Sequence, residues 1–280
     1  MSRDFSELRI EGLGGSFGGM EALEQEPPVN WLIPGWIAAR EISCLYGKGG
    51  TFKSYFGVGI SLQLAWDETG VLYIAAEGTS GLRSRVAAWM AKRRLIDRRF
   101  DNWHYYNSSV PLDMKGNRKY WIRELQKYLG DREIKLIIVD TLARNFAGDE
   151  NSSQEMGEFV EGCEILKREF DAAVLIVHHT TNDGKKERGT ETLRNATFAM
   201  FKTQNAGYTK TGGGSVDVIC DRMKDAIRPE GVKVKFETVT LDTDEHGDVH
   251  ELSQAMEIFP PSTPATKPSE KKQEKEIVVK

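Results

Sequence analysis

The feature that most constrains this chain is a glycine-rich run that follows a short apolar segment and precedes a helical pattern. The run is Gly47-Lys48-Gly49-Gly50-Thr51-Phe52-Lys53-Ser54. A loop between a strand and a helix points several backbone N–H groups inward, and the helix N-terminus adds its own positive end. Glycines let this backbone approach an anion closely. The run therefore predicts a phosphate-binding loop, and its final Lys-Ser pair predicts that the ligand is ATP with Mg²⁺.

The last three residues of the loop have separate expected roles. Lys53 should reach the β- and γ-phosphates, and the Ser54 hydroxyl should ligate Mg²⁺. Phe52 departs from the usual pattern G-x-x-x-x-G-K-[ST], because it stands where the last glycine is expected. Its N–H can still donate to a phosphate, but its bulky side chain must find room. The alternative interpretation is a glycine-rich turn with a chance lysine.

Two acidic residues follow apolar runs of the kind that form buried strands. Asp140 follows Leu136-Ile137-Ile138-Val139, so we expect it at the carboxyl edge of a parallel sheet, where α/β proteins bind ligands. There it would hold Mg²⁺; a polar strand end is the alternative. Glu77 follows the run 71–76 and would polarise the attacking water if its strand lies close to the phosphate loop. Alternatively, Glu77 simply begins a turn.

A histidine pair, His178-His179, closes the apolar run 173–177. Side chains alternate along a strand, so one histidine should face the core and the other the phosphate. We predict that the pair belongs to the nucleotide site and senses the γ-phosphate, with a structural histidine as the alternative. A metal site needs more ligands than these two residues offer.

Apolar runs and helical patterns alternate along most of the chain, which predicts an α/β fold with a mostly parallel central sheet and helices on both faces. Predicted strands cover 42–46, 71–76, 103–106, 135–139 and 173–177, and predicted helices cover 53–67, 82–94, 118–129 and 155–170. The later runs, which predict antiparallel strands added at the C-terminal side, are 198–203, 215–220 and 232–241.

The two ends of the chain differ from its centre. Residues 1–30 are mostly polar and glycine-containing, and they predict an irregular arm. Residues 260–280 are rich in Pro, Ser, Thr, Lys and Glu, and they predict a disordered charged tail. One folded ATPase domain is therefore expected over residues 31–259.

Charge and composition limit the environment and the partners. The formal net charge is -4, so any contact with nucleic acid must come from local basic loops. No segment approaches the roughly 18 apolar residues of a membrane span, and the N-terminus lacks an apolar signal core. The cysteines, Cys44, Cys163 and Cys220, are far apart and predicted to be reduced. A cytoplasmic protein without a membrane partner is expected.

The phosphate loop, the glutamate and aspartate at strand ends and the histidine pair together resemble the RecA-like ATPases. The resemblance spans roughly residues 30–245 and is closest to hexameric replicative helicases of the DnaB and plasmid RepA type and their phage relatives. It implies a RecA-like P-loop fold, ATP hydrolysis, a homo-oligomeric ring (a hexamer) and movement on single-stranded DNA. DnaB-type helicases also carry a helical N-terminal domain, which residues 1–30 cannot supply, so the smaller plasmid type is the better match.

The resemblance also implies roles for basic residues late in the chain. In these helicases a basic residue reaches the γ-phosphate bound by the neighbouring subunit and takes part in catalysis there. The corresponding residues here are Arg222 and Lys224, with Arg228 in reserve. A solvated charge run is the alternative.

Two loops correspond to the nucleic-acid loops of that family, residues 143–153 and 180–192. The basic residues that the resemblance assigns to DNA are Arg144, Lys185, Lys186 and Arg188. A ring would concentrate their modest charge in one channel, which reconciles DNA binding with an acidic chain. Flexible solvated loops are the alternative.

Other functions remain open for the same core. A RecA/RadA-like recombinase or recombination mediator would form filaments instead of rings. The run Lys48-Gly49-Gly50-x-x-Lys53-Ser54 is also similar to that of partitioning-type ATPases, non-motor switches whose first lysine crosses a dimer interface. That family has an Asp-rich stretch ending in proline on a later strand, and neither residues 73–77 nor the segment after Asp140 offers one.

Overall fold

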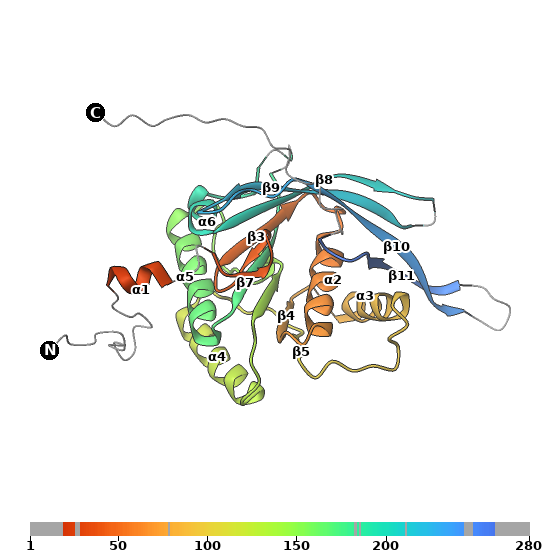
Figure 1. Cartoon of the computed structure of the whole chain (residues 1–280), viewed down its shortest axis with the longest axis horizontal. Helices are drawn as coiled ribbons and strands as arrows, with labels where there is room; N and C mark the ends of the chain where they lie inside the picture. The colour runs from red at the N-terminus through yellow and green to blue at the C-terminus, as the bar shows by residue number, and fades with distance from the viewer. Residues whose placement is uncertain are drawn as a thin grey trace.

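The computed structural model describes residues 19–25, 29–77, 79–181, 184, 186–210, 212–243 and 249–260. Its centre is a sheet of nine strands in the order β11-β10-β9-β8-β3-β7-β6-β4-β5, with a short hairpin of β1 and β2 beside it (Figure 1). The strands are β1 (Trp31–Ile33), β2 (Ile37–Ala38), β3 (Ile42–Gly47), β4 (Val71–Ala75), β5 (Trp103–Tyr106), β6 (Leu136–Asp140), β7 (Ala173–His179), β8 (Ala199–Tyr208), β9 (Gly214–Met223), β10 (Val232–Thr243) and β11 (Val249–Met256).

Helices cover both faces of this sheet. They are α1 (Met20–Gln25), α2 (Lys53–Trp66), α3 (Thr79–Lys92), α4 (Lys115–Leu129), α5 (Ser153–Phe170) and α6 (Glu191–Ala196), with a 3-10 turn η1 (Leu142–Arg144). In Figure 1, α4 and α5 lie on one side of the sheet and α2 and α3 on the other. The predicted α/β class, with a mostly parallel sheet covered on both faces, is confirmed.

Two hydrophobic clusters, one on each face, hold the layers together. Alternate side chains of β7 divide between them: Leu175 and Val177 pack with α2, and Val174 and Ile176 pack with α4 and α5. This alternation follows from the two-residue period of a strand and explains why the central strands are apolar throughout. It also fixes the face to which each residue at the carboxyl end of a strand belongs.

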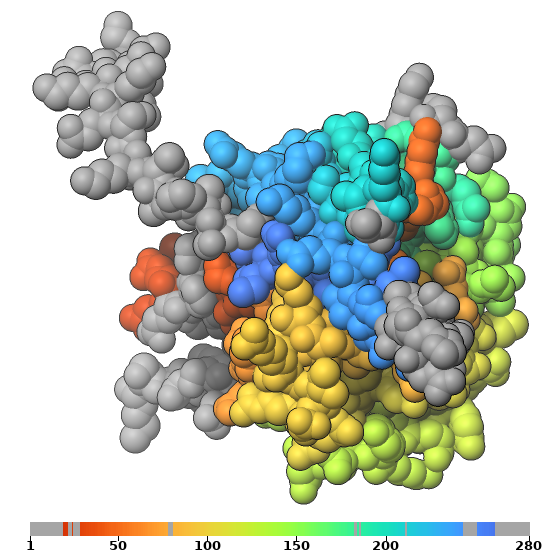
Figure 2. Space-filling model, turned by 90° about the vertical axis from the view of Figure 1, so that its right-hand side faces the viewer, coloured from red at the N-terminus to blue at the C-terminus, as the bar shows by residue number. Residues whose placement is uncertain are grey.

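The C-terminal strands extend the sheet as expected but contain one more member than predicted. β8 is parallel to β3, and β9, β10 and β11 follow in antiparallel order. The fourth strand, β11, was missed because polar residues interrupt its apolar pattern. It packs with β10 against α3, where the blue and yellow segments meet in Figure 2, and Ser84 Oγ donates to Glu251 Oε1 at 2.5 Å.

Other differences concern short elements. α1 falls inside the segment expected to be an irregular arm, and α6 overlaps the end of the predicted loop 180–192. Residues 1–18 of the predicted arm and 261–280 of the predicted tail lie outside the described residues. Of the helices that the structure describes, none has the length and apolar character needed to cross a membrane.

Candidate nucleotide site

The phosphate loop joins β3 to α2 at the carboxyl edge of the sheet. Gly47 is tightly enclosed, since a Cβ there would lie 2.8 Å from Thr51 Oγ1 and 2.9 Å from the carbonyl oxygen of Thr203. The two threonine hydroxyls are 2.7 Å apart, which fastens the loop to β8. The loop shape is therefore fixed by a strand about 150 residues further along the chain.

Lys53 begins α2 and turns back over the loop. Its Nζ donates to the carbonyl oxygens of Gly47 (3.0 Å) and Lys48 (2.7 Å), and the residue is only 6% exposed. Burial lowers the pKa of Lys53 to about 8, while Asp140 and Glu77 oppose this shift. An ammonium with few neutralising partners at the centre of a ring of amides is suited to bind a polyanion.

Phe52 has the backbone conformation that a glycine would adopt, with φ 59° and ψ 13°. Its side chain finds room beneath the late strands. The ring stacks on Phe236 at 4.5 Å between centroids and 7° between planes, and it lies 5.0 Å from the ring of Tyr208. Tyr55 completes this aromatic cluster. The departure from the usual loop pattern thus changes the packing around the loop without disrupting its path.

Asp140 ends β6 and lies beside the first turn of α2. Its Oδ1 accepts a hydrogen bond from Ser54 Oγ at 3.2 Å, and its Oδ2 accepts one from Tyr73 at 2.5 Å. Burial raises the pKa of Asp140, and the hydrogen bonds from Tyr73 and Ser54 counter that rise. A hydroxyl and a carboxylate oxygen at this spacing are the hard ligands that Mg²⁺ prefers, so this pair fits the ion.

Glu77 follows β4, which neighbours β6 but is separated from β3 by β7 and β6. It reaches the site because its strand ends beside Asp140. Glu77 Oε1 accepts a hydrogen bond from Thr141 Oγ1 at 3.2 Å, and the residue is exposed. The carboxylate also contributes to the electrostatic environment of Lys53. It is held at one oxygen and open to solvent.

The two histidines face opposite sides of the sheet. His178 is fully buried on the α5 side, beside Tyr46, and its Nε2 donates to the carbonyl oxygen of Arg188 at 2.8 Å. His179 is half-buried on the α2 side. Burial lowers the pKa of His179, and the nearby Lys53 ammonium lowers it further. Of the pair, His179 is the residue placed beside the phosphate loop.

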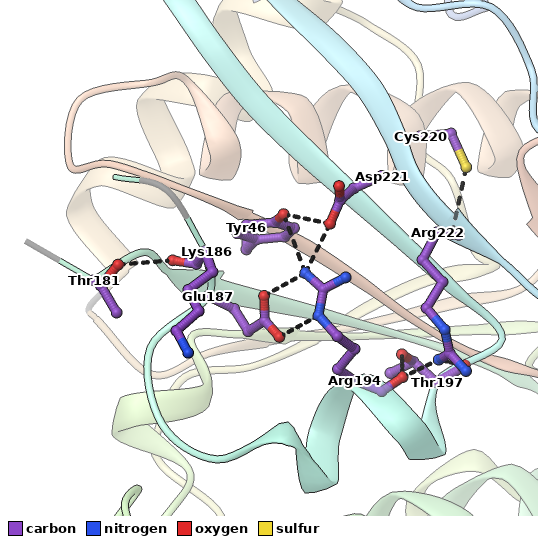
Figure 3. Close-up of polar contacts among 9 residues, drawn as sticks. All are labelled: Tyr46, Thr181, Lys186, Glu187, Arg194, Thr197, Cys220, Asp221 and Arg222. Atoms are coloured by element: carbon purple, nitrogen blue, oxygen red, sulfur yellow. Dashed lines mark hydrogen bonds and ion pairs between the residues drawn. The ribbon is translucent and has the colours of Figure 1, made fainter. Parts of the chain in front are cut away.

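Arg222 and Lys224, predicted to act across a subunit interface, lie away from this loop. Arg222 donates to the carbonyl oxygens of Arg194 and Thr197, and Lys224 Nζ donates to that of Asn195 at 2.7 Å (Figure 3). Both cations therefore satisfy the last carbonyls of α6, where positive charge is favourable. Within the chain, their contacts are those of a helix cap.

A charged cluster beneath the loop centres on Arg194 of α6. Its guanidinium makes two hydrogen bonds of 2.6 Å to Glu187 and one of 2.7 Å to Asp221, which also accepts from Tyr46 at 2.8 Å (Figure 3). Burial raises the pKa of Glu187, but the paired guanidinium more than compensates, and the net pKa is lowered. Because Tyr46 precedes the phosphate loop and Glu187 lies in the loop 180–192, the cluster links these two segments.

The residues predicted to contact DNA are spread over two loops at the same edge of the sheet. Arg144, in η1, and Lys186 are exposed. Arg188 is paired with Glu150 of the other loop. Lys185 lies outside the described residues. The loop 180–192 is less open than expected, because Thr180 and Glu187 form an antiparallel bridge.

Sequence reasoning missed two residues near Asp140. Tyr73 belongs to the apolar run of β4 and gave no sign that its hydroxyl would face a carboxylate. Arg85, on α3, lies 4.9 Å over the Tyr55 ring and favours the ionised form of Asp140. Its Nε is buried without a hydrogen-bond partner among the described residues. The chain offered no local signal for Arg85, because α3 reaches the site only through packing.

Strand order, phosphate loop and acidic partners together define a P-loop ATPase with a RecA-like fold, as the sequence motifs predicted. The model of the AAA domain family matches residues 16–185, more than half of the chain. The chain belongs to this family. Domains of this class use ATP, typically with Mg²⁺.

A solved structure of an ATPase domain, that of a DnaB-like helicase, is similar to this chain with a TM-score of 0.54. The match covers 78% of this chain and 92% of that chain at 11% sequence identity. At this identity the similarity concerns the fold. No curated protein matches the chain.

Proposed function

We propose that this ATPase is a ring-forming motor on single-stranded DNA, a replicative helicase of the plasmid or phage kind. The observation that carries the proposal is a juxtaposition at one edge of the sheet. Glu77, suited to activate water, lies beside Asp140, and the loops 143–153 and 180–192 leave the strands that end at Asp140 and His179. Hydrolysis and DNA contact would then share the same strand ends.

The chain's own groups divide the work of hydrolysis. Lys53 and the loop amides bind and orient the triphosphate, and Ser54 and Asp140 would hold Mg²⁺, which neutralises phosphate charge when bound. Tyr73 keeps the Asp140 carboxylate in place through its 2.5 Å hydrogen bond. Glu77 accepts the proton of the attacking water, and the Thr141 hydroxyl orients its carboxylate.

Transfer of the nucleotide state to the DNA loops would run through β7. His179 lies beside Lys53, and the main chain of Arg188 is hydrogen-bonded to both histidines, because its N–H donates to the His179 carbonyl at 3.0 Å. In a ring, Arg222 and Lys224 would complete the neighbouring site, which requires them to reach beyond the α6 carbonyls. A ring also brings the basic loops of several subunits together.

The position of Lys48 favours this proposal over a partitioning-type switch. Its side chain lies against Gly184 of the same chain, so closely that a Cβ there would clash with it. A partitioning-type ATPase would need this lysine to extend into a second subunit. A recombinase shares the same core and differs in assembly.

ATPase rates measured with and without single-stranded DNA, together with the mass of the assembly, test the proposal. A motor should hydrolyse ATP faster when DNA is present and should assemble into closed rings with an ATP analogue. The Glu77→Gln chain is the control for contaminating ATPases. Filaments in electron micrographs would favour the recombinase, and DNA-insensitive dimers would favour the switch.

A further inference from the structure

An ion pair joins the two loops assigned to DNA. Arg188 Nε lies 2.5 Å from Glu150 Oε2, and Arg188 Nη2 lies 2.6 Å from Glu150 Oε1. Two parallel N–H···O bonds of this kind are the arrangement in which a guanidinium binds a carboxylate or a phosphate best. Glu150 comes from the loop 143–153 and Arg188 from the loop 180–192, so the pair closes one loop against the other.

Main-chain contacts hold Arg188 and leave its side chain free to exchange partners. The Arg188 N–H donates to His179 and its carbonyl oxygen accepts from His178, so its backbone is anchored at the end of β7. The Arg188 side chain is 47% exposed, whereas that of Glu150 is 13% exposed. The outer side of the guanidinium therefore faces solvent while its inner edge contacts Glu150.

Arg188 differs in this respect from the other described arginine of the two loops. Arg144 is exposed and forms no ion pair within the part of the chain that the structure describes. The bidentate carboxylate is thus specific to Arg188, beside the histidine that lies next to Lys53.

We propose that Glu150 occupies Arg188 as an internal substitute for a nucleic-acid phosphate and that bound DNA takes its place. The inference rests on the proposed function, because it requires a DNA strand at these loops. A backbone phosphate presents two acceptor oxygens to the same N–H groups, so the exchange replaces one bidentate partner with another. Glu150 accordingly restrains DNA affinity in the resting chain.

Glu150→Gln tests this role, because it removes the carboxylate charge and keeps the size of the side chain. Binding of fluorescein-labelled oligo(dT) to the full chain is followed by fluorescence anisotropy in the presence of a non-hydrolysable ATP analogue and Mg²⁺. We expect about fivefold tighter binding at low salt, the gain from freeing one partly exposed ion pair. The dependence of log K on log salt should steepen by about 0.7, because one more phosphate is neutralised.

The matched control is Asp149→Asn. Asp149 is exposed, lies next to Glu150 and accepts a hydrogen bond from the Asn151 N–H at 2.9 Å, which an asparagine oxygen can also accept. It removes the same charge without touching Arg188, so affinity should change little. Adding Arg188→Ala to Glu150→Gln should cancel the gain. Glu150→Asp, which keeps the charge but shortens the side chain, gives a second variant and should also bind more tightly.

The possible results separate this inference from the proposed function. If the unaltered chain binds oligo(dT) and neither Glu150 variant binds more tightly, the inference is overturned and the motor proposal stands. An equal gain from Asp149→Asn also overturns it, since the effect would then be one of general charge. If no variant binds single-stranded DNA, both proposals are overturned.

Discussion

Phe52 provides a test of how this phosphate loop is held, because it combines an unfavourable backbone with favourable packing. Its φ of 59° lies in the left-handed region, where a side chain costs about 1 kcal/mol relative to glycine. Its ring is 5% exposed and stacks on Phe236. Replacing Phe52 with glycine removes both terms, whereas replacing it with alanine removes only the packing.

The two substitutions should therefore differ in a defined direction. Loss of a buried phenylalanine side chain costs about 3–5 kcal/mol, which is the expected destabilisation for Phe52→Ala. Phe52→Gly loses the same contacts but relieves the backbone, so we expect about 2–4 kcal/mol. Glycine should be the less damaging replacement by about 1 kcal/mol, although alanine is normally the better residue near a helix N-terminus.

Urea denaturation of the three chains, followed by circular dichroism, measures this difference. The dependence of the unfolding free energy on urea should be unchanged, so that midpoints can be compared directly. ATP binding by Phe52→Gly should be retained, because the loop amide is still present. Equal stability of the two variants, or a more stable alanine variant, would refute the account of Phe52 as a strained residue held by its aromatic neighbours.

Three further predictions concern the site. Glu77→Gln should lower hydrolysis by about 10²–10⁴ and leave ATP binding intact; normal turnover would remove Glu77 from catalysis. Because the pKa of Lys53 is lowered to about 8 from 10.5, ATP affinity should be constant below about pH 7 and fall about tenfold by pH 9, whereas Lys53→Arg should show no such fall. Between those two pKa values the unfolded chain binds more protons, so the unfolding free energy should rise with pH there. Arg222→Ala and Lys224→Ala should each lower that free energy by about 1 kcal/mol, since α6 loses a cap. If they also act in trans, mixing either with Glu77→Gln should restore ATPase activity; no recovery on mixing would leave them as caps alone.

Several parts of the fold followed from local sequence alone. The loop from Gly47 to Ser54 and the apolar runs before Asp140 and His178 each carry their signal within about ten residues. Strand type, helix period and loop chemistry are local properties, so they can be read without knowing the neighbours. The weaker elements, β11, α1 and α6, were missed because they are short or polar and form through contacts with other parts of the chain.

The sequence by itself determined that this chain has a phosphate loop in an α/β fold, with acidic residues at the strand ends that approach it. Only the tertiary structure decided that His179 and not His178 lies beside Lys53, because that depends on which face of β7 is covered by α2. It also decided that Phe52 packs against Phe236 and that Arg188 pairs with Glu150. These contacts join residues far apart in the chain, and no local period records which distant strand or loop will arrive beside them.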